Sequence, residues 1–265
     1  MTRAETEWAV ALFRKSVLKQ AKFRRILELL DDPAGRTNLD IGADNGVISY
    51  LLRQRGGQWS SADLDPRAVA SIRQLVGTDV YQLDGSRMPF ADRSFDQVVV
   101  VDYLEHVHDD RAFARELERI MVPGGAAIIN VPHLQPRSPL NRFRHGIGLT
   151  DEWHGHLRPG YTAASLSDVL GPRFRIERTI TYSRFGSELV DTGLNGVYEL
   201  MRKRKGGVAS AKGTVVTQDD LQRHRKQFRL LSALYPVLRL TAATDLLLPW
   251  QPGHKLILRA RLAAG

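Results

Sequence analysis

The stretch from Asn38 to Leu52, NLDIGADNGVISYLL, constrains the fold more than any other part of the chain. It joins a short apolar run, typical of a buried strand, to an apolar pattern at helical spacing. The loop between them carries a glycine at each end, Gly42 and Gly46. Glycine lets a backbone approach a ligand closely. A strand, a glycine loop and a helix in this order predict a site for the polar part of a nucleotide cofactor.

A dinucleotide-binding loop is the first alternative to test. Its G-x-G-x-x-G pattern would need glycine at positions 42, 44 and 47, but Asp44 and Val47 stand at two of them. The spacing here is D-x-G-x-x-x-G, formed by Asp40, Gly42 and Gly46. We therefore do not expect a dinucleotide.

Strand and helix patterns alternate along the rest of the chain. The run SFDQVVVVDYL (94–104) is continuously apolar and β-branched, as expected of a strand buried on both faces. One amphipathic helix is predicted from about Glu5 to Leu30. Strands are predicted at residues 37–41, 58–64, 79–84, 94–104, 125–132, 173–183 and 254–262. This alternation predicts an α/β fold with a doubly wound, mostly parallel seven-stranded sheet.

The chain divides into four parts. We predict an N-terminal helical cap (1–37), a core (38–185), a helical insertion before the last strand (186–252) and the final strand of the core (253–265). The insertion contains a flexible segment, GGVASAKGT, and then an apolar stretch that charges and a proline interrupt. We expect it to be a packed helical subdomain. A lid, a homodimer interface and a membrane-facing element are the open alternatives.

Composition limits the chemistry. The chain has no cysteine, which excludes disulfides, thiolate zinc sites and cysteine nucleophiles. Its first residues do not resemble a signal peptide and no apolar run is long enough to span a bilayer, so we expect a soluble, cytoplasmic protein. The net charge of +9 suits a partner with phosphates, although an arginine-rich enzyme surface explains it equally well.

Several segments in order resemble the class I S-adenosylmethionine-dependent methyltransferases of the small-molecule type. LDIGADNG resembles the first motif of that family, in which a third glycine usually stands where this chain has Asp44. SADLDP resembles the second motif, and YQLDGSRMPFADRSFDQVVVVDYLEHV the third and fourth. ELERIMVPGGAAIINVPH resembles the helix, turn and strand that follow. The resemblance covers Asn38 to His133 and implies a Rossmann-like methyltransferase fold with S-adenosylmethionine as cofactor.

The resemblance also assigns candidate cofactor contacts. Asp63 ends the second strand, and its carboxylate can accept hydrogen bonds from both ribose hydroxyls. Asp65 is its rival, but is better placed to cap the next helix. Asp84 is expected at the adenine amino group, or is merely a turn residue. The full set is Asp40, Gly42, Ala43, Asp44, Gly46, Asp63, Leu64, Asp84, Gly85, Asp102 and Tyr103.

Two segments after strand ends carry candidate catalytic histidines. LEHVHDD contributes His106, and TDEWHGHLRPGY contributes His154 and His156, of which His156 is preferred as the base. Packing or capping is the alternative role for each of them and the expected role for His108.

A metal site is a further hypothesis. The D-x-x-E-H spacing of Asp102, Glu105 and His106 is similar to the E-x-x-E-H of RNA 3′-end 2′-O-methyltransferases, which hold a divalent metal with a further histidine. The segment around LEHV is also similar to O-methyltransferases of quinone biosynthesis. Because metal-free relatives share LEH, we expect no metal here.

These observations predict methyl transfer to a small-molecule acceptor, with a hydroxyl oxygen favoured over a nitrogen as the methylated atom. We expect this acceptor to be hydrophobic or lipid-linked. Methyltransferases of exocyclic base amines carry an Asn/Asp-Pro-Pro-aromatic motif where this chain has DYLEH, so nucleic acid is not the expected partner. An RNA 2′-O-methyltransferase and a non-catalytic cofactor-binding relative are the alternatives. A homodimer and a peripheral membrane contact through 186–252 both stay open.

Overall fold

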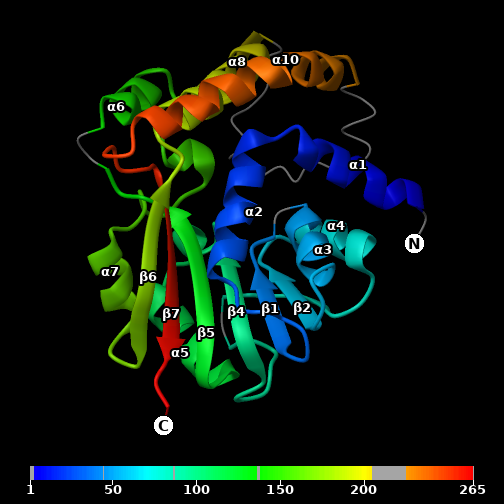
Figure 1. The fold of residues 1–265 in the computed structure, drawn as a ribbon, viewed down its shortest axis with the longest axis vertical. Helices are drawn as coiled ribbons and strands as arrows, with labels where there is room; N and C mark the ends of the chain where they lie inside the picture. Colours follow the sequence, from blue (N-terminus) through cyan, green and yellow to red (C-terminus); the bar gives the residue numbers. More distant parts are fainter. Residues whose placement is uncertain (1–2, 44, 86, 136–137, 205–224, 265) are drawn as a thin grey trace.

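A seven-stranded sheet forms the centre of the molecule, seen in the computed structural model, which describes residues 3–43, 45–85, 87–135, 138–204 and 225–264 (Figure 1). The strand order is β3-β2-β1-β4-β5-β7-β6. Strand β7 is antiparallel to β5 and β6, and the other pairs are parallel. The strands are β1 Thr37–Ile41, β2 Gln58–Asp63, β3 Val80–Gln82, β4 Phe95–Val101, β5 Met121–Pro132, β6 Phe174–Tyr182 and β7 Lys255–Leu262. The predicted doubly wound fold is confirmed.

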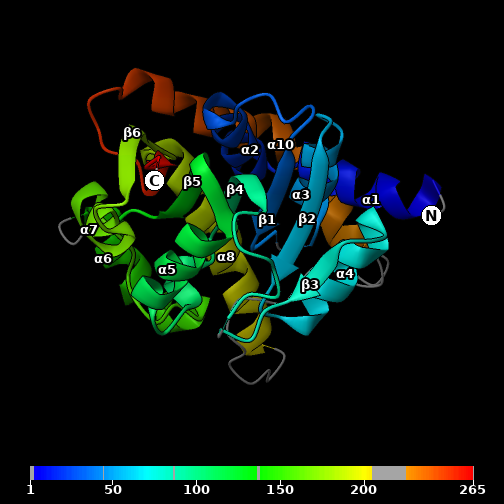
Figure 2. The ribbon, with the colours of Figure 1, turned by 90° about the horizontal axis from the view of Figure 1, so that it is seen from below.

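Helices cover both faces of the sheet (Figure 2). Alternate residues of β4 point to opposite sides: Val98 and Val100 pack with α5 and α7, whereas Val99 and Val101 pack with α2 and α3. The helices are α1 Arg3–Arg14, α2 Val17–Leu29, α3 Val47–Arg53, α4 Pro66–Val76, α5 Asp110–Ile120, α6 Pro139–Gly146, α7 Ala163–Leu170, α8 Phe185–Arg204 and α10 Arg225–Ala243. Short 3₁₀ turns are η1 Leu104–His106, η2 Glu152–His154 and η3 Thr244–Leu247.

The N-terminal cap differs from the prediction in one respect. The single helix expected from Glu5 to Leu30 is wrong, because the chain forms two helices, α1 and α2. Ser16 separates them: its backbone is extended, and its hydroxyl accepts a hydrogen bond from the Lys19 amide at 3.3 Å. A serine in this position favours a new helix start over continuation of the old one.

Most of the described part of the insertion before β7 is helical, and residues 248–252 are irregular. Helices α8 and α10 pack together and lie above the carboxyl ends of β4 and β5 (Figure 1). The segment GGVASAKGT, expected to be flexible, lies outside the described residues. Helix α6, in the chain after β5, was not predicted. Its first turn is capped by Ser138 and begins with Pro139, a signal that can be read in the sequence.

Candidate active site

The loop after β1 depends on its two glycines. Gly42 and Gly46 have φ of +82° and +83°, which other residues adopt only with strain. A Cβ on Gly42 would stand 2.2 Å from the Val101 carbonyl oxygen, and one on Gly46 would stand 2.7 Å from the Ile72 Cα. The glycines therefore allow the loop to pack against β4 and α4. Asp44, between them, lies outside the described residues.

Asp40 lies beneath this loop. It is fully buried, and its carboxylate accepts hydrogen bonds from the Ser49 hydroxyl at 2.5 Å and the Ser61 hydroxyl at 2.8 Å. The Arg53 guanidinium lies 3.6 Å away. These contacts join β1, β2 and α3. Asp40 was predicted to be a cofactor contact. Because its carboxylate is occupied by these partners, it would act on the cofactor through the backbone of the loop.

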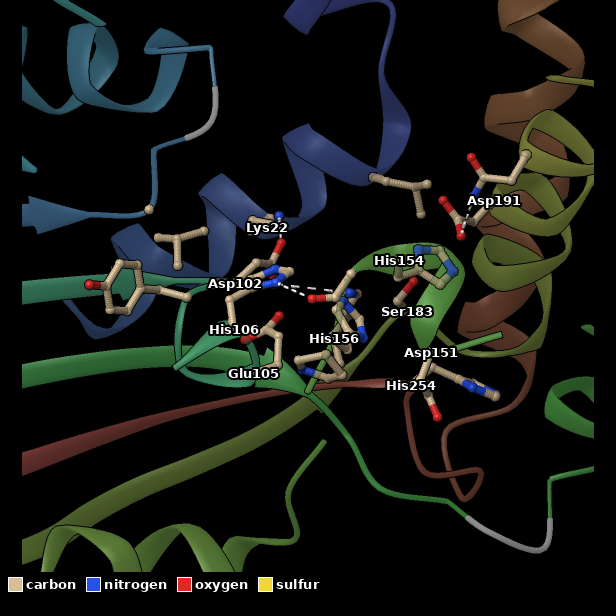
Figure 3. Close-up of a pocket in the computed structure, with 18 of the residues that line it drawn as sticks. Lys22, Asp102, Glu105, His106, Asp151, His154, His156, Ser183, Asp191 and His254 are labelled. Atoms are coloured by element: carbon tan, nitrogen blue, oxygen red, sulfur yellow. Dashed lines mark hydrogen bonds and ion pairs between the residues drawn. The ribbon is translucent and has the colours of Figure 1, made fainter. Parts of the chain in front are cut away.

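A cavity of about 1190 Å³ runs along the carboxyl ends of the parallel strands. One half is lined by the glycine loop and the end of β2, including Gly42, Ala43, Asp63 and Leu64. The other half extends under α6 and α8. Its lining includes Asp102, His106, Arg144, Asp151, His154, His156, Asp191, His254 and Lys255 (Figure 3). The two halves meet at the end of β4.

The first half of the cavity contains residues that the sequence predicts to contact the cofactor. Asp63 is 9% exposed at the end of β2, and Asp65 caps α4 through the Arg67 amide at 2.9 Å, as expected. Tyr103 is nearly buried. Burial and the negative charges of Asp63 and Asp84 raise its pKa well above the ordinary value. Both carboxylates are thus near this ring, although Asp84 lies in the exposed turn after β3 with Gly85.

Asp102 lies at the junction of the two halves with a φ of +45°. Its carboxylate accepts a hydrogen bond from the Asn130 amide at 2.7 Å and forms an ion pair with Lys22 of α2. The Lys255 ammonium is 3.9 Å away. Burial opposes ionisation, but the two ammonium groups outweigh it and hold the pKa of Asp102 below its usual range. Asp102 is therefore a charged link between three elements.

Glu105 is the most unusual carboxyl group of the site. It is fully buried, and neither of its oxygens has a hydrogen-bond partner among the described residues. Burial, reinforced by the charge of Asp102, raises its pKa to about 8 despite the opposing charges of Lys255 and Lys22. Glu105 is consequently uncharged over much of the neutral range.

Two hydrogen bonds fold the loop after β5 back onto η1. The His106 Nδ1–H donates to the Gly155 carbonyl at 2.8 Å, and the Leu157 amide donates to the Glu105 carbonyl at 2.8 Å. In the neutral imidazole the first bond places the proton on Nδ1, which makes Nε2 the hydrogen-bond acceptor. The clamp brings His156 beside His106, although fifty positions separate them in the chain.

The three predicted histidines form a row. The ring centroids of His106 and His156 are 5.1 Å apart, and those of His156 and His154 are 5.3 Å apart in a stacked arrangement. Arg144 of α6 lies 3.3 Å from the Nε2 of His154. His108, by contrast, is exposed. The structure thus gathers the catalytic candidates in one half of the cavity (Figure 3).

The aromatic and basic neighbours of these histidines anchor the loop. Trp153 is buried and donates a hydrogen bond to Glu199 of α8 at 2.8 Å. Arg158 forms an ion pair with Asp110, and the Tyr161 hydroxyl donates to the same carboxylate at 3.0 Å. These contacts explain how a polar loop is held in one conformation.

Glu105, His106 and His156 could together hold a divalent cation, because one ligand atom from each lies within 4.8 Å of the others. Asp102, the first residue of the D-x-x-E-H pattern, is outside this group and is paired with Lys22 instead. The charges of Lys22 and Lys255 act on Glu105 and would oppose a cation.

Sequence reasoning missed the residues that remote elements bring to the cavity. Lys22 comes from α2, Arg144 from α6, Asp191 from α8 and Lys255 from β7. None stands in a local motif. The one sequence signal among them is the basic run RKSVLKQAKFRR (14–25), which contains Lys22.

Comparison with known proteins agrees with this fold. Residues 39–129 match the family model described as a methyltransferase domain. The chain is 30% identical over 146 residues to an uncharacterized methyltransferase of Mycobacterium sp. strain KMS, covering 52% of this chain and 58% of that protein. It is 33% identical over 113 residues to a ubiquinone biosynthesis O-methyltransferase of Pseudomonas paraeruginosa, covering 40% and 49%. The chain thus spans only about half the length of these relatives.

Solved structures share the fold at low identity. An S-adenosylmethionine-dependent methyltransferase from Mesorhizobium loti matches with a TM-score of 0.56 and 14% identity, over 91% of this chain and 97% of that one. The [4+2]-cyclase SpnF matches with a TM-score of 0.55 and 17% identity, over 93% and 82%. The strand order with β7 reversed, the glycine loop and the family match define a methyltransferase domain. Residues 39–129 therefore match a methyltransferase domain, and the sheet has the strand order of the class I S-adenosylmethionine-dependent methyltransferase fold.

We predict that Asp63→Ala weakens S-adenosylmethionine binding by about 1.5–3 kcal/mol, the range for hydrogen bonds to a charged group. Isothermal titration calorimetry measures the effect. Asp65→Ala is the matched control, because that carboxylate caps α4 and should affect stability more than affinity. An unchanged affinity in Asp63→Ala would remove the ribose role from this residue.

We predict that the purified protein contains no stoichiometric metal and that EDTA leaves its activity intact. The positive charges of Lys22 and Lys255, which act on Glu105, would oppose a cation there. Elemental analysis gives the first result directly. One equivalent of metal in the native chain that is lost in His156→Ala would contradict the prediction and assign the ion to the group of Glu105, His106 and His156.

We predict that Glu105 makes folding stability fall as pH rises. Its pKa is about 8 in the folded state against an ordinary 4.5, so the native state retains a proton that the unfolded state releases between these values. Glu105→Gln keeps a neutral group there and should gain stability relative to the native chain between pH 5 and pH 9. Urea unfolding in EDTA at both pH values measures the difference. If the free energy of unfolding changed equally with pH in the two proteins, Glu105 would not have a raised pKa.

Proposed function

We propose that this chain transfers a methyl group from S-adenosylmethionine to a hydroxyl of a small-molecule acceptor. The observation that carries the proposal is the row of His106, His156 and His154 in the half of the cavity beyond the cofactor positions. Imidazole exchanges protons near neutral pH and suits a base that removes a hydroxyl proton. The name of the Pseudomonas relative, an O-methyltransferase, supports oxygen as the acceptor atom.

The bound cofactor would supply an electrophilic methyl group, and the chain's own residues would orient the acceptor and remove its proton. His156 is the proposed base, since the loop clamp holds it next to η1 at the end of β4. The Nε2 of His106 is positioned to accept a second hydrogen bond. Fixed groups of this kind align the reacting oxygen, which is the main requirement of an in-line displacement.

The walls of this half indicate a polar head on the acceptor. Arg144 forms ion pairs with Glu188 at 2.6 Å and Asp191 at 3.2 Å, and these residues line the cavity with Lys255. A hydroxyl-bearing head group could exchange hydrogen bonds with them. An apolar or lipid-linked remainder would extend past Leu194, which lines the cavity and is 39% exposed.

The direct test is an acceptor screen. Phenols, catechols and small alcohols, with and without a lipid tail, are incubated with S-adenosylmethionine, and mass spectrometry detects the methylated product and S-adenosylhomocysteine. Methylation only of an RNA 2′-hydroxyl would support the first alternative function. Cofactor binding with no product from any acceptor would support a non-catalytic relative.

We predict that His156→Ala lowers turnover by about 10²–10⁴-fold, the usual contribution of a positioned base. Affinity for S-adenosylmethionine should change little, because the proposed cofactor contacts come from the loop after β1 and the end of β2. His154→Ala is assayed beside it, and His108→Ala is the control, since His108 is exposed. Normal turnover in both cavity variants would make these histidines structural and leave His106 as the candidate.

A further inference from the structure

Exposed apolar side chains are concentrated on the insertion. Of the fifteen large apolar side chains that are exposed in the described part of the chain, twelve lie between Phe185 and Trp250. Single exposed apolar residues scatter over most protein surfaces, but a concentration of this kind marks a contact with another molecule or a membrane.

Helix α10 shows why these side chains are not needed by the fold. Its inner side is already packed: the Tyr235 hydroxyl accepts a hydrogen bond from Gln20 at 3.1 Å, and Ala242 is buried. Leu230, Leu234 and Val237 follow one another at helical spacing on a different side and are 62%, 44% and 60% exposed. This side of the helix therefore has no partner among the described residues.

The turn η3 extends the same surface. Asp245 fixes it to the start of α8 by accepting hydrogen bonds from the amides of Arg184 at 2.7 Å and Gly186 at 2.8 Å. The segment is thus held in place by its polar groups while its apolar side chains point outward. We call the whole set the α10–η3 surface; its members are Leu230, Leu234, Val237, Leu240, Leu246, Leu247 and Trp250.

The positive charge of α10 indicates which kind of partner covers the α10–η3 surface. Helix α10 has no acidic residue and carries Arg225, Lys226, Arg229 and Arg239, and the whole chain has a net charge of +9. A second copy placed symmetrically against α10 would bring these positive charges together. An anionic membrane would instead attract them, while leucine and tryptophan side chains enter the interface between head groups and acyl chains.

We propose that the α10–η3 surface binds the surface of a membrane that contains anionic lipids. None of the described helices is long and apolar enough to cross a bilayer, so the helix lies along the interface. The adjacent helix α8 packs on α10 and carries Asp191 into the cavity. Membrane contact therefore lies next to the half of the cavity assigned to the acceptor, and it does not depend on which acceptor is methylated.

Vesicle co-sedimentation tests the proposal without an enzyme assay. The full chain is mixed with vesicles of phosphatidylcholine alone or of phosphatidylcholine and phosphatidylglycerol at about 7:3. We expect binding to the anionic vesicles that weakens in high salt, and little binding to the neutral ones. The triple variant Leu246→Glu, Leu247→Glu, Trp250→Glu should lower partitioning at least tenfold. These side chains are 81%, 71% and 77% exposed, so folding should be preserved, and thermal unfolding verifies this.

Leu157→Glu is the matched control, because Leu157 is 50% exposed but lies outside the insertion, and it should bind vesicles like the native chain. Equal binding by the triple variant would overturn the proposal, as would failure of the native chain to bind anionic vesicles. A dimer that the triple variant abolishes, seen by light scattering in the absence of vesicles, would assign the surface to a second copy and also overturn it.

Discussion

The site depends on the ion pair between Asp102 and Lys22. Asp102 follows β4 in a left-handed conformation that costs energy for a residue other than glycine. Its hydrogen bond from Asn130 of β5 and the nearby Lys255 of β7 stabilise that conformation. Through Lys22 the same carboxylate holds α2 over the cavity. One charged group thus fixes the helical cap, the central strands and the reversed strand relative to one another.

The hydrogen bonds that begin at Asp102 continue along the cavity wall to the end of β6. Asn130 accepts a hydrogen bond from the Tyr182 hydroxyl at 2.5 Å, and Tyr182 ends β6, after which the chain enters the insertion. Burial raises the pKa of Tyr182 well above its ordinary value, helped by the negative charge of Asp102, so its hydroxyl keeps the proton that it donates. The position of α8, and with it the cavity wall that carries Asp191, is therefore linked to Asp102 through two hydrogen bonds.

The sequence predicted what depends on neighbours in the chain. The burial of Val98 to Val101 on both faces of the sheet and the close backbone approach at Gly42 and Gly46 follow from local patterns, and the mostly parallel sheet follows from the order of strands and helices. The break at Ser16 was missed because an apolar helical pattern runs through it, although serine offers a cap. The acceptor half could not be predicted, since Arg144 and Lys255 reach it from elements whose packing is decided only in three dimensions.

The electrostatics of the site fit a reaction in which a positive charge is lost. A sulfonium is cationic before methyl transfer and neutral afterwards, so an uncompensated carboxylate beside it would stabilise the reactant more than the transition state. Asp102 is ionised but neutralised by Lys22, with Lys255 close by, and Glu105 is protonated below a pKa of about 8. In the proposed reaction these two carboxyl groups, which line the cavity, would add little net negative charge beside the sulfonium. Ionisation of Glu105 at higher pH would add such a charge, which links the titration of this buried group to the rate of methyl transfer as well as to stability.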